Sequence, residues 1–169
     1  MKAIFLIFCF LLYTPSALAT TPGEVQVGSY LPDATLQGLL VKSKKLSEFR
    51  GKPLIINVWA SWCGPCREEM GSLARLSRRL GGKEFNIIGI STDDDTRPAV
   101  NLIVQSRLTF SNFIDKNMML ENMLGANTIP LTILVDANGR VLKKVRGFQV
   151  WDSPESIKQI GRIFQISMN

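Results

Sequence analysis

The chain has 169 residues, of which 46% are apolar and 20% are charged, so it is long enough to bury one sizeable core and is unlike a disordered protein. It contains three cysteines and no histidine, which excludes a Cys–His catalytic pair, c-type haem attachment and histidine-ligated metal sites. The formal net charge of +6 comes from scattered basic residues, a pattern typical of solvated faces rather than of a nucleic-acid-binding surface.

The N-terminus has the pattern of a secretory signal peptide. Lys2 forms a short basic region, residues 3–12 form an apolar core, and Ala17-Leu18-Ala19 is a small-x-small cleavage site. We therefore expect cleavage after Ala19 and export to the periplasm. An uncleaved N-terminal membrane anchor is the alternative, although the apolar run is short for a membrane span.

Export would leave a mature chain with only two cysteines. Cys9 lies within the signal, so Cys63 and Cys66 remain, and the loss of Lys2 leaves 19 basic and 14 acidic residues, a net charge of +5. Two cysteines are too few for a structural zinc site. We expect no cofactor, no metal and no nucleic-acid partner. We divide the chain into a signal (residues 1–19), a flexible N-terminus (20–30) and one domain (31–169), and expect a monomer.

The first elements of the domain lead into a central strand. We expect short strands at residues 34–37 and 39–42, followed by a single helical turn over residues 46–52. Residues 53–60 form a near-continuous apolar and β-branched run, which is typical of a strand covered on both faces.

An amphipathic helix follows this strand and begins at the cysteines. Met70, Leu73, Leu76 and Leu80 recur at helical spacing after Cys66, and Gly81-Gly82 ends the pattern. The sequence therefore predicts that Cys63 stands at a helix N-terminus.

The remaining elements alternate between strands and helices. We expect the following elements in order: a buried strand at 85–91, a helix at 98–107, a strand at 110–115, a short helix at 117–124, a hairpin with strands at 131–136 and 140–146, and a last helix after Ser153-Pro154. The acids at 93–95 are open to two interpretations, a metal site or helix capping, and capping is the better account because a helix follows them.

The spacing of the two cysteines indicates redox chemistry. A helix N-terminus favours the thiolate, which is the nucleophilic form of cysteine. Cys66 lies one helical turn beyond Cys63, so the two sulfurs can close a disulfide, and we expect Cys63 to be exposed and Cys66 shielded. Gly64 leaves room for another protein's sulfur, and Pro65 fits the first turn. A purely structural disulfide is the alternative, but so short a loop restrains little chain entropy.

Three segments together resemble the exported thioredoxin-like proteins of the TlpA/ResA/CcmG type. They are Leu46-Ser47-Glu48-Phe49-Arg50-Gly51-Lys52, the run from Asn57 to Met70 that contains Trp62-Cys63-Gly64-Pro65-Cys66, and the run from Ile129 to Arg140 that begins Ile129-Pro130-Leu131-Thr132. The resemblance implies an α/β thioredoxin fold with a central mixed β-sheet flanked by helices. It also implies an N-terminal β extension, a βα insertion at residues 97–115, and a cis peptide bond before Pro130 facing the cysteines.

The resemblance also implies a function. It predicts a thiol-disulfide oxidoreductase in which Cys63 attacks a client disulfide and Cys66 resolves the mixed disulfide, while Ile129 and Pro130 hold the client backbone. Relatives of this type serve cytochrome c maturation, oxidase assembly and general disulfide repair, and receive electrons from membrane partners of the DsbD/CcdA type. The absence of a histidine between the cysteines favours a reductant.

Three residues depart from the family pattern. Asn57 stands where thioredoxin itself has a buried acid, Gly71 replaces a proline in the active-site helix, and Leu131 follows Pro130 where many relatives have threonine. Because Asn57 cannot exchange protons, we expect a proton relay to Cys66 from Glu69, which lies three residues beyond Cys66 and so on its side of the helix. The alternative for Glu69 is an exposed helix carboxylate.

Two other activities are alternatives to disulfide reduction. Copper handling would use both thiolates as soft Cu(I) ligands with help from Met118, Met119 and Met123, although packing explains methionines more simply. Thiol peroxidases usually have Thr or Ser three residues before the reactive cysteine, where this chain has Ala60.

Overall fold

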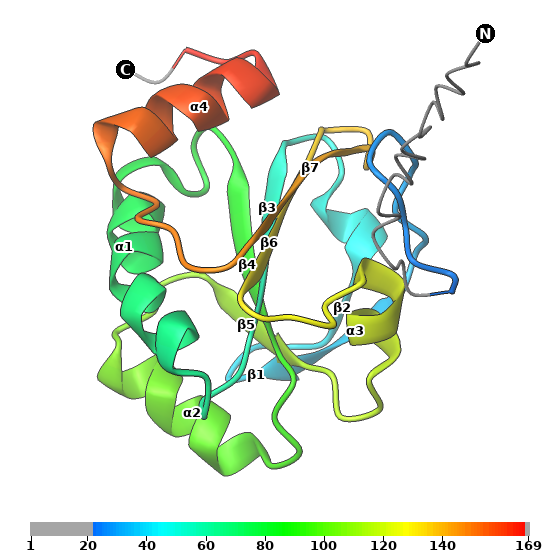
Figure 1. The fold of residues 1–169 in the computed structure, drawn as a ribbon, viewed down its shortest axis with the longest axis vertical. Coiled ribbons are helices and arrows are strands. Elements are labelled where there is room, and N and C mark those ends of the chain that lie inside the picture. Colours follow the sequence, from blue (N-terminus) through cyan, green and yellow to red (C-terminus); the bar gives the residue numbers. More distant parts are fainter. Residues whose placement is uncertain (1–21, 168–169) are drawn as a thin grey trace, which may run out of the picture.

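The computed structural model describes residues 22–167 and shows one sheet with helices on both faces (Figure 1). The seven strands have the order β2-β1-β5-β4-β3-β6-β7. Along the chain the elements are β1 (Thr35–Leu39), β2 (Lys44–Lys45), η1 (Leu46–Phe49), β3 (Leu54–Trp59), α1 (Gly64–Leu80), β4 (Asn86–Ser91), α2 (Thr96–Gln105), β5 (Ser111–Ile114), α3 (Met119–Leu124), β6 (Leu131–Val135), β7 (Val141–Arg146) and α4 (Pro154–Phe164).

The strand β3 is central and entirely buried, as its apolar sequence predicts. It pairs in parallel with β4 and antiparallel with β6. Because successive side chains of a strand point to opposite faces, Ile55 and Trp59 pack on one side and Leu54, Ile56 and Val58 on the other. The carboxyl end of β3 delivers the chain directly to the cysteines.

Two hydrophobic layers cover the two faces of the sheet. One layer contains the apolar sides of α1, α2 and α4, and the other contains α3, η1 and the N-terminal segment. Figure 1 shows the same division, with α1, α2 and α4 on one side of the sheet and α3 on the other. This arrangement confirms the thioredoxin fold with its mixed sheet flanked by helices.

The βα insertion lies where the resemblance places it. Between β4 and α3 the chain forms α2 and then β5, which runs parallel to β4 and antiparallel to β1. The N-terminal extension is the hairpin of β1 and β2, which lengthens the sheet beyond β5.

One expected strand is wrong. Residues 39–42 do not form a second strand, because Leu40 has a left-handed backbone (φ 60°) and turns the chain away from β1. Gly38 permits the tight turn, since a Cβ there would stand 1.9 Å from the carbonyl oxygen of Val41. The first strand therefore runs two residues past its expected end, and β2 is limited to Lys44–Lys45.

Residues 22–30, part of the segment expected to be flexible, are attached to the domain. The amide of Val25 donates to the carbonyl of Met123, and the amide of Gly28 donates to the carbonyl of Val141. The buried carboxylate of Glu24 pairs with Lys144, 2.5 Å away. These bonds hold part of residues 22–30 against the rest of the chain, and the expected signal over residues 1–19 lies outside the described residues. Within those residues no helix is long and apolar enough to cross a membrane.

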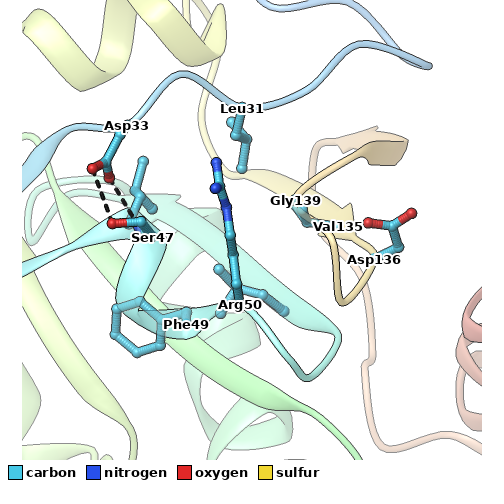
Figure 2. A pocket seen from close by; sticks show the side chains of 10 residues that line it. Leu31, Asp33, Ser47, Phe49, Arg50, Val135, Asp136 and Gly139 are labelled. Carbon is cyan, nitrogen blue, oxygen red and sulfur yellow. Dashed lines mark hydrogen bonds between the residues drawn. The ribbon is translucent and has the colours of Figure 1, made fainter.

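A small hollow marks the end of the sheet opposite the cysteines (Figure 2). It has a volume of about 20 Å³ and lies between Leu54 at the start of β3 and Val135 at the end of β6. Both the amide and the hydroxyl of Ser47 donate to Asp33 here, at 2.9 Å each. These bonds fasten η1 to the chain before β1 and so help to fix the entry into β3.

Candidate active site at the Cys63–Cys66 pair

The helix α1 begins at the cysteines, as its apolar spacing predicts. Cys63 is the N-cap residue, and its Sγ accepts a hydrogen bond of 3.2 Å from the amide of Cys66. Pro65 lies in the first turn, and a Cβ on Gly64 would meet no atom within 4 Å. Cys63 and Cys66 form a disulfide. The pair is thus a dithiol/disulfide couple at the positive end of a helix dipole.

The two cysteines differ in accessibility, but less than we expected. Cys66 is fully buried, and Cys63 has a relative accessibility of only 6%. The expectation that Cys63 is exposed is therefore wrong in this oxidised state. Its sulfur is enclosed by the amide of Cys66 at 3.2 Å and by the carbonyl oxygen of Ile129 at 3.9 Å.

The loop before β6 forms the wall facing Cys63. The peptide bond between Ile129 and Pro130 is cis, which confirms the expectation from the resemblance. The carbonyl of Pro130 accepts a hydrogen bond of 2.8 Å from the amide of Gly147. Leu131 is fully buried and packs in the core, so this departure from the family pattern does not alter the outer surface of the loop.

A buried carboxylate lies one helical turn beyond Cys66. Glu69 is fully buried, and its Oε1 accepts a hydrogen bond of 2.7 Å from Nδ2 of Asn57. Its Oε2 accepts a hydrogen bond of 3.1 Å from the amide of Gln149. The alternative of an exposed helix carboxylate is therefore wrong. The structure places Asn57 and Glu69 together, although they lie on different elements.

Burial decides the protonation of Glu69. Loss of hydration raises the pKa of Glu69 to about 7, and the hydrogen bonds from Asn57 and Gln149 only partly oppose this effect. The amide of Asn57 also donates to Oγ1 of Thr132 at 3.0 Å. A carboxyl that titrates near neutral pH in a dry site is suited to proton transfer.

The loop after β7 anchors this site to α1. The amide of Trp151 donates to Oγ of Ser72 at 3.1 Å, two residues after the amide of Gln149 reaches Glu69. Phe148 and Val150 in the same loop expose 48% and 43% of their surface. The loop therefore adds apolar surface on the side of Pro130.

Comparisons with known proteins agree with this geometry. The profile of the Redoxin family matches residues 26–160. The chain belongs to the Redoxin family. Among its relatives, the thiol-disulfide oxidoreductase ResA of Geobacillus thermodenitrificans is 31% identical over 140 residues, which cover 83% of this chain and 79% of the relative. ResA of Bacillus thuringiensis subsp. konkukian is 29% identical over 136 residues, covering 80% and 79%.

Solved structures of other proteins resemble this chain as well. The crystal structure described as thiol:disulfide interchange protein DsbE of Chlorobium tepidum is 28% identical and has a TM-score of 0.75, with 83% of this chain and 99% of that chain covered. A solution structure described as a protein disulfide isomerase of Bacteroides thetaiotaomicron is 25% identical with a TM-score of 0.70, covering 83% and 91%. This Redoxin-family chain is a thiol-disulfide oxidoreductase of the ResA/DsbE type, which confirms the TlpA/ResA/CcmG resemblance.

Met118, Met119 and Met123, the candidate copper ligands, lie at the start of α3 and within it. Met118 and Met119 expose 54% and 53% of their surface, and Met123 is half-buried. Met118 lines a surface hollow together with Trp62, the residue before Cys63. Among residues 22–167, no cluster of three or more His, Cys, Asp or Glu side chains is arranged to hold a metal ion.

Sequence reasoning missed one residue of this Redoxin-family site. Asp93 is buried, and its carboxylate accepts hydrogen bonds from the amide and hydroxyl of Ser61 at 3.0 and 2.6 Å and from the hydroxyl of Ser91 at 2.7 Å. We expected the acids at 93–95 to cap a helix, which is true of Asp95 only. The predicted order of strands could have indicated this contact. Because β3 and β4 are parallel neighbours, the loops after them, which carry Ser61 and Asp93, meet at one edge of the sheet.

We expect Asp93→Ala to lower the free energy of unfolding by about 3 kcal/mol, because it leaves the half-buried Ser61 and the buried Ser91 without their charged partner. Urea unfolding of the oxidised protein measures this loss. Asp95→Ala, which removes an exposed helix cap, is the matched control and should cost less. Equal losses in the two variants would contradict the role assigned to Asp93.

Proposed function

We propose that this protein is an exported reductase of protein disulfides, in which Cys63 attacks the client and Cys66 resolves the complex. The observation that carries this proposal is the position of Cys63, which caps α1 and lies 3.9 Å from the carbonyl oxygen of Ile129. A cysteine at a helix N-terminus beside an open backbone edge has both the thiolate character and the docking surface that exchange needs.

The proposed reaction transfers two electrons to the client. The Cys63 thiolate attacks one sulfur of the client disulfide, forms a mixed disulfide and releases the other client sulfur as a thiolate. The Cys66 thiolate then attacks the sulfur of Cys63, which releases the second client thiolate. The enzyme ends with the Cys63–Cys66 disulfide, and the client ends with two thiols.

The resolving step requires Cys66 to lose a proton in a buried position. Glu69 follows Cys66 by one helical turn and has a pKa raised to about 7. We assign to Glu69 the acceptance of this proton and its return to solvent. Asn57 and Gln149 hold the carboxylate in place through bonds of 2.7 and 3.1 Å.

We assign client binding to the backbone of Ile129 and Pro130. Ile129, the half-buried residue before Pro130, has its carbonyl oxygen 3.9 Å from the sulfur of Cys63. An extended client segment can add to this edge through main-chain hydrogen bonds, as in other strand-addition complexes. The clients we propose are proteins of cytochrome c maturation or oxidase assembly. The enzyme works as a monomer in the periplasm after removal of residues 1–19.

We expect a reduction potential more negative than about −200 mV. The chain contains no histidine, so no imidazolium stabilises the Cys63 thiolate, and only the helix end does so. Equilibration with glutathione buffers measures the potential. A value near −120 mV, typical of a strong oxidant, would contradict the reductant assignment.

A reductant outside the cytoplasm needs a continuous supply of electrons. We propose a membrane donor of the DsbD/CcdA type, which would keep Cys63 and Cys66 reduced in cells. Trapping of the cellular thiol state with an alkylating reagent tests this point. A pair that is fully oxidised in cells that possess such a donor would favour a disulfide donor instead.

A further inference from the structure

A surface hollow of about 200 Å³ lies directly beside the proposed attack site. It is lined by Trp62, which precedes Cys63, and by Ile129, whose carbonyl oxygen is 3.9 Å from the sulfur of Cys63. The exposed side chain of Met118 forms a further part of its wall. A client segment paired with Ile129 would pass over this hollow.

Part of the wall of the hollow is apolar and accessible. Trp62 exposes 71% and Met118 exposes 54% of its surface, although both are large apolar residues. An exposed aromatic ring and a flexible thioether are typical of surfaces that bind a partner's side chain. They suit the aliphatic stem of a long side chain.

Two carboxylates also line the hollow. Asp94 comes from the loop after β4, and Glu121 comes from α3. Within the part of the chain that the structure describes, neither carboxylate has a hydrogen bond or ion pair from its side chain. Partial burial and the negative charge of Asp115 raise the pKa of Glu121. A cation in the hollow would lower this pKa again, because it favours the ionised carboxylate.

Among the described residues, no lysine or arginine lines the hollow, and basic residues close to it in sequence act on other groups. Arg97 pairs with Asp95 at 2.8 Å, and Lys116 acts on the same carboxylate. Arg146 donates to Oδ1 of Asn127 on the hollow's edge at 3.2 Å, but its guanidinium also pairs with the buried Glu24. The lining of the hollow therefore carries negative charge, on a chain whose net charge is positive.

We propose that this hollow selects clients that carry a lysine or arginine two positions from the reactive cysteine. In an extended segment, side chains two positions apart point to the same side and are separated by about 7 Å. When the client cysteine faces Cys63, the side chain two positions away enters the hollow. Its stem lies along Trp62 and Met118, and its charge meets Asp94 and Glu121. This inference rests on the proposed reduction of client disulfides.

The test uses peptides whose single cysteine is blocked by a disulfide to 2-mercaptoethanol, with Lys, Gln or Glu two positions before or after the cysteine. The rate of reduction by the reduced protein is divided by the rate with dithiothreitol, which removes the intrinsic reactivity of each peptide. We expect the Lys peptide to be reduced about fivefold faster than the Glu peptide at low ionic strength, with Gln between them. Added salt should diminish this ratio.

The double variant Asp94→Asn/Glu121→Gln should bring the Lys-to-Glu ratio close to one. The double variant Glu84→Gln/Glu155→Gln removes the same charge outside the hollow and should keep the wild-type ratio. Equal rates for all peptides with the wild-type protein would overturn the inference alone, as would a lysine preference that persists in Asp94→Asn/Glu121→Gln. Failure to reduce any peptide would overturn the proposed function as well.

Discussion

Replacement of Cys63 by serine should abolish disulfide exchange, whereas Cys66→Ser should give a protein that attacks once and stays bound to its client. The reason is that the sulfur of Cys63 attacks the client and the sulfur of Cys66 resolves the mixed disulfide. Cys63 caps α1 and keeps a relative accessibility of 6%, while Cys66 is fully buried and is bonded to Cys63 in the oxidised protein. Loss of the attacking thiolate removes the first bond-forming step, and loss of the resolving thiolate removes only the second.

Gel electrophoresis without reductant measures this difference in cells that express each variant. Cys66→Ser should yield covalent complexes that dissolve on reduction, and mass spectrometry of these complexes identifies the client. The double variant Cys63→Ser/Cys66→Ser is the control and should yield none. Complexes of equal abundance with Cys63→Ser would show that the two roles are reversed.

Glu69→Gln should slow the resolving step on the order of 100-fold and remove its dependence on pH near 7. The wild-type carboxyl has a pKa of about 7 and must be ionised to accept the proton of Cys66. The wild-type rate should therefore rise as pH increases through 7. Glutamine cannot ionise, so the variant lacks this inflection. Glu68→Gln changes the exposed neighbouring carboxylate on the same helix and should leave the profile intact.

The same substitution should change the pH dependence of stability. Folding raises the pKa of Glu69 from 4.5 to about 7, so the folded state binds this proton more tightly than the unfolded state does. The resulting stabilisation is full below pH 4.5 and is lost as pH rises through 7, a change of about 3 kcal/mol over the whole window. Urea unfolding of oxidised wild-type and Glu69→Gln proteins at pH 5 and pH 8 measures most of it. Parallel stability profiles would contradict the buried, titrating carboxyl.

Much of the site could be predicted from sequence because its signals are local. The apolar run of β3 and the helical spacing after Cys66 fix the strand–helix junction, and the terminal position of Cys63 follows from them. The cis peptide before Pro130 has no local signal and came from the family resemblance.

The features that sequence reasoning missed depend on contacts between distant segments. The enclosure of Cys63 needs the carbonyl of Ile129, 66 residues away. Asp93 fastens Ser61 only because β3 and β4 lie side by side. The burial of Glu69 depends on Gln149, which comes from the loop after β7.

Two other features of the backbone could not be predicted from the pattern of apolar residues. The run around Leu40 resembles a strand, but a left-handed residue breaks it. The N-terminal segment is polar and resembles a flexible tail, yet the buried ion pair of Glu24 with Lys144 attaches it to β7. Such an ion pair is invisible in a local pattern, because its partners are 120 residues apart.

The most direct test of the account is differential alkylation of the fully reduced protein with limiting iodoacetamide at pH 7, with the labelled cysteine identified by fragment-ion mass spectrometry. A thiolate at a helix N-terminus that also contacts solvent reacts before a buried thiol. We expect Cys63 to be labelled at least about tenfold faster than Cys66. Equal labelling, or faster labelling of Cys66, would contradict the assignment of Cys63 as the attacking residue.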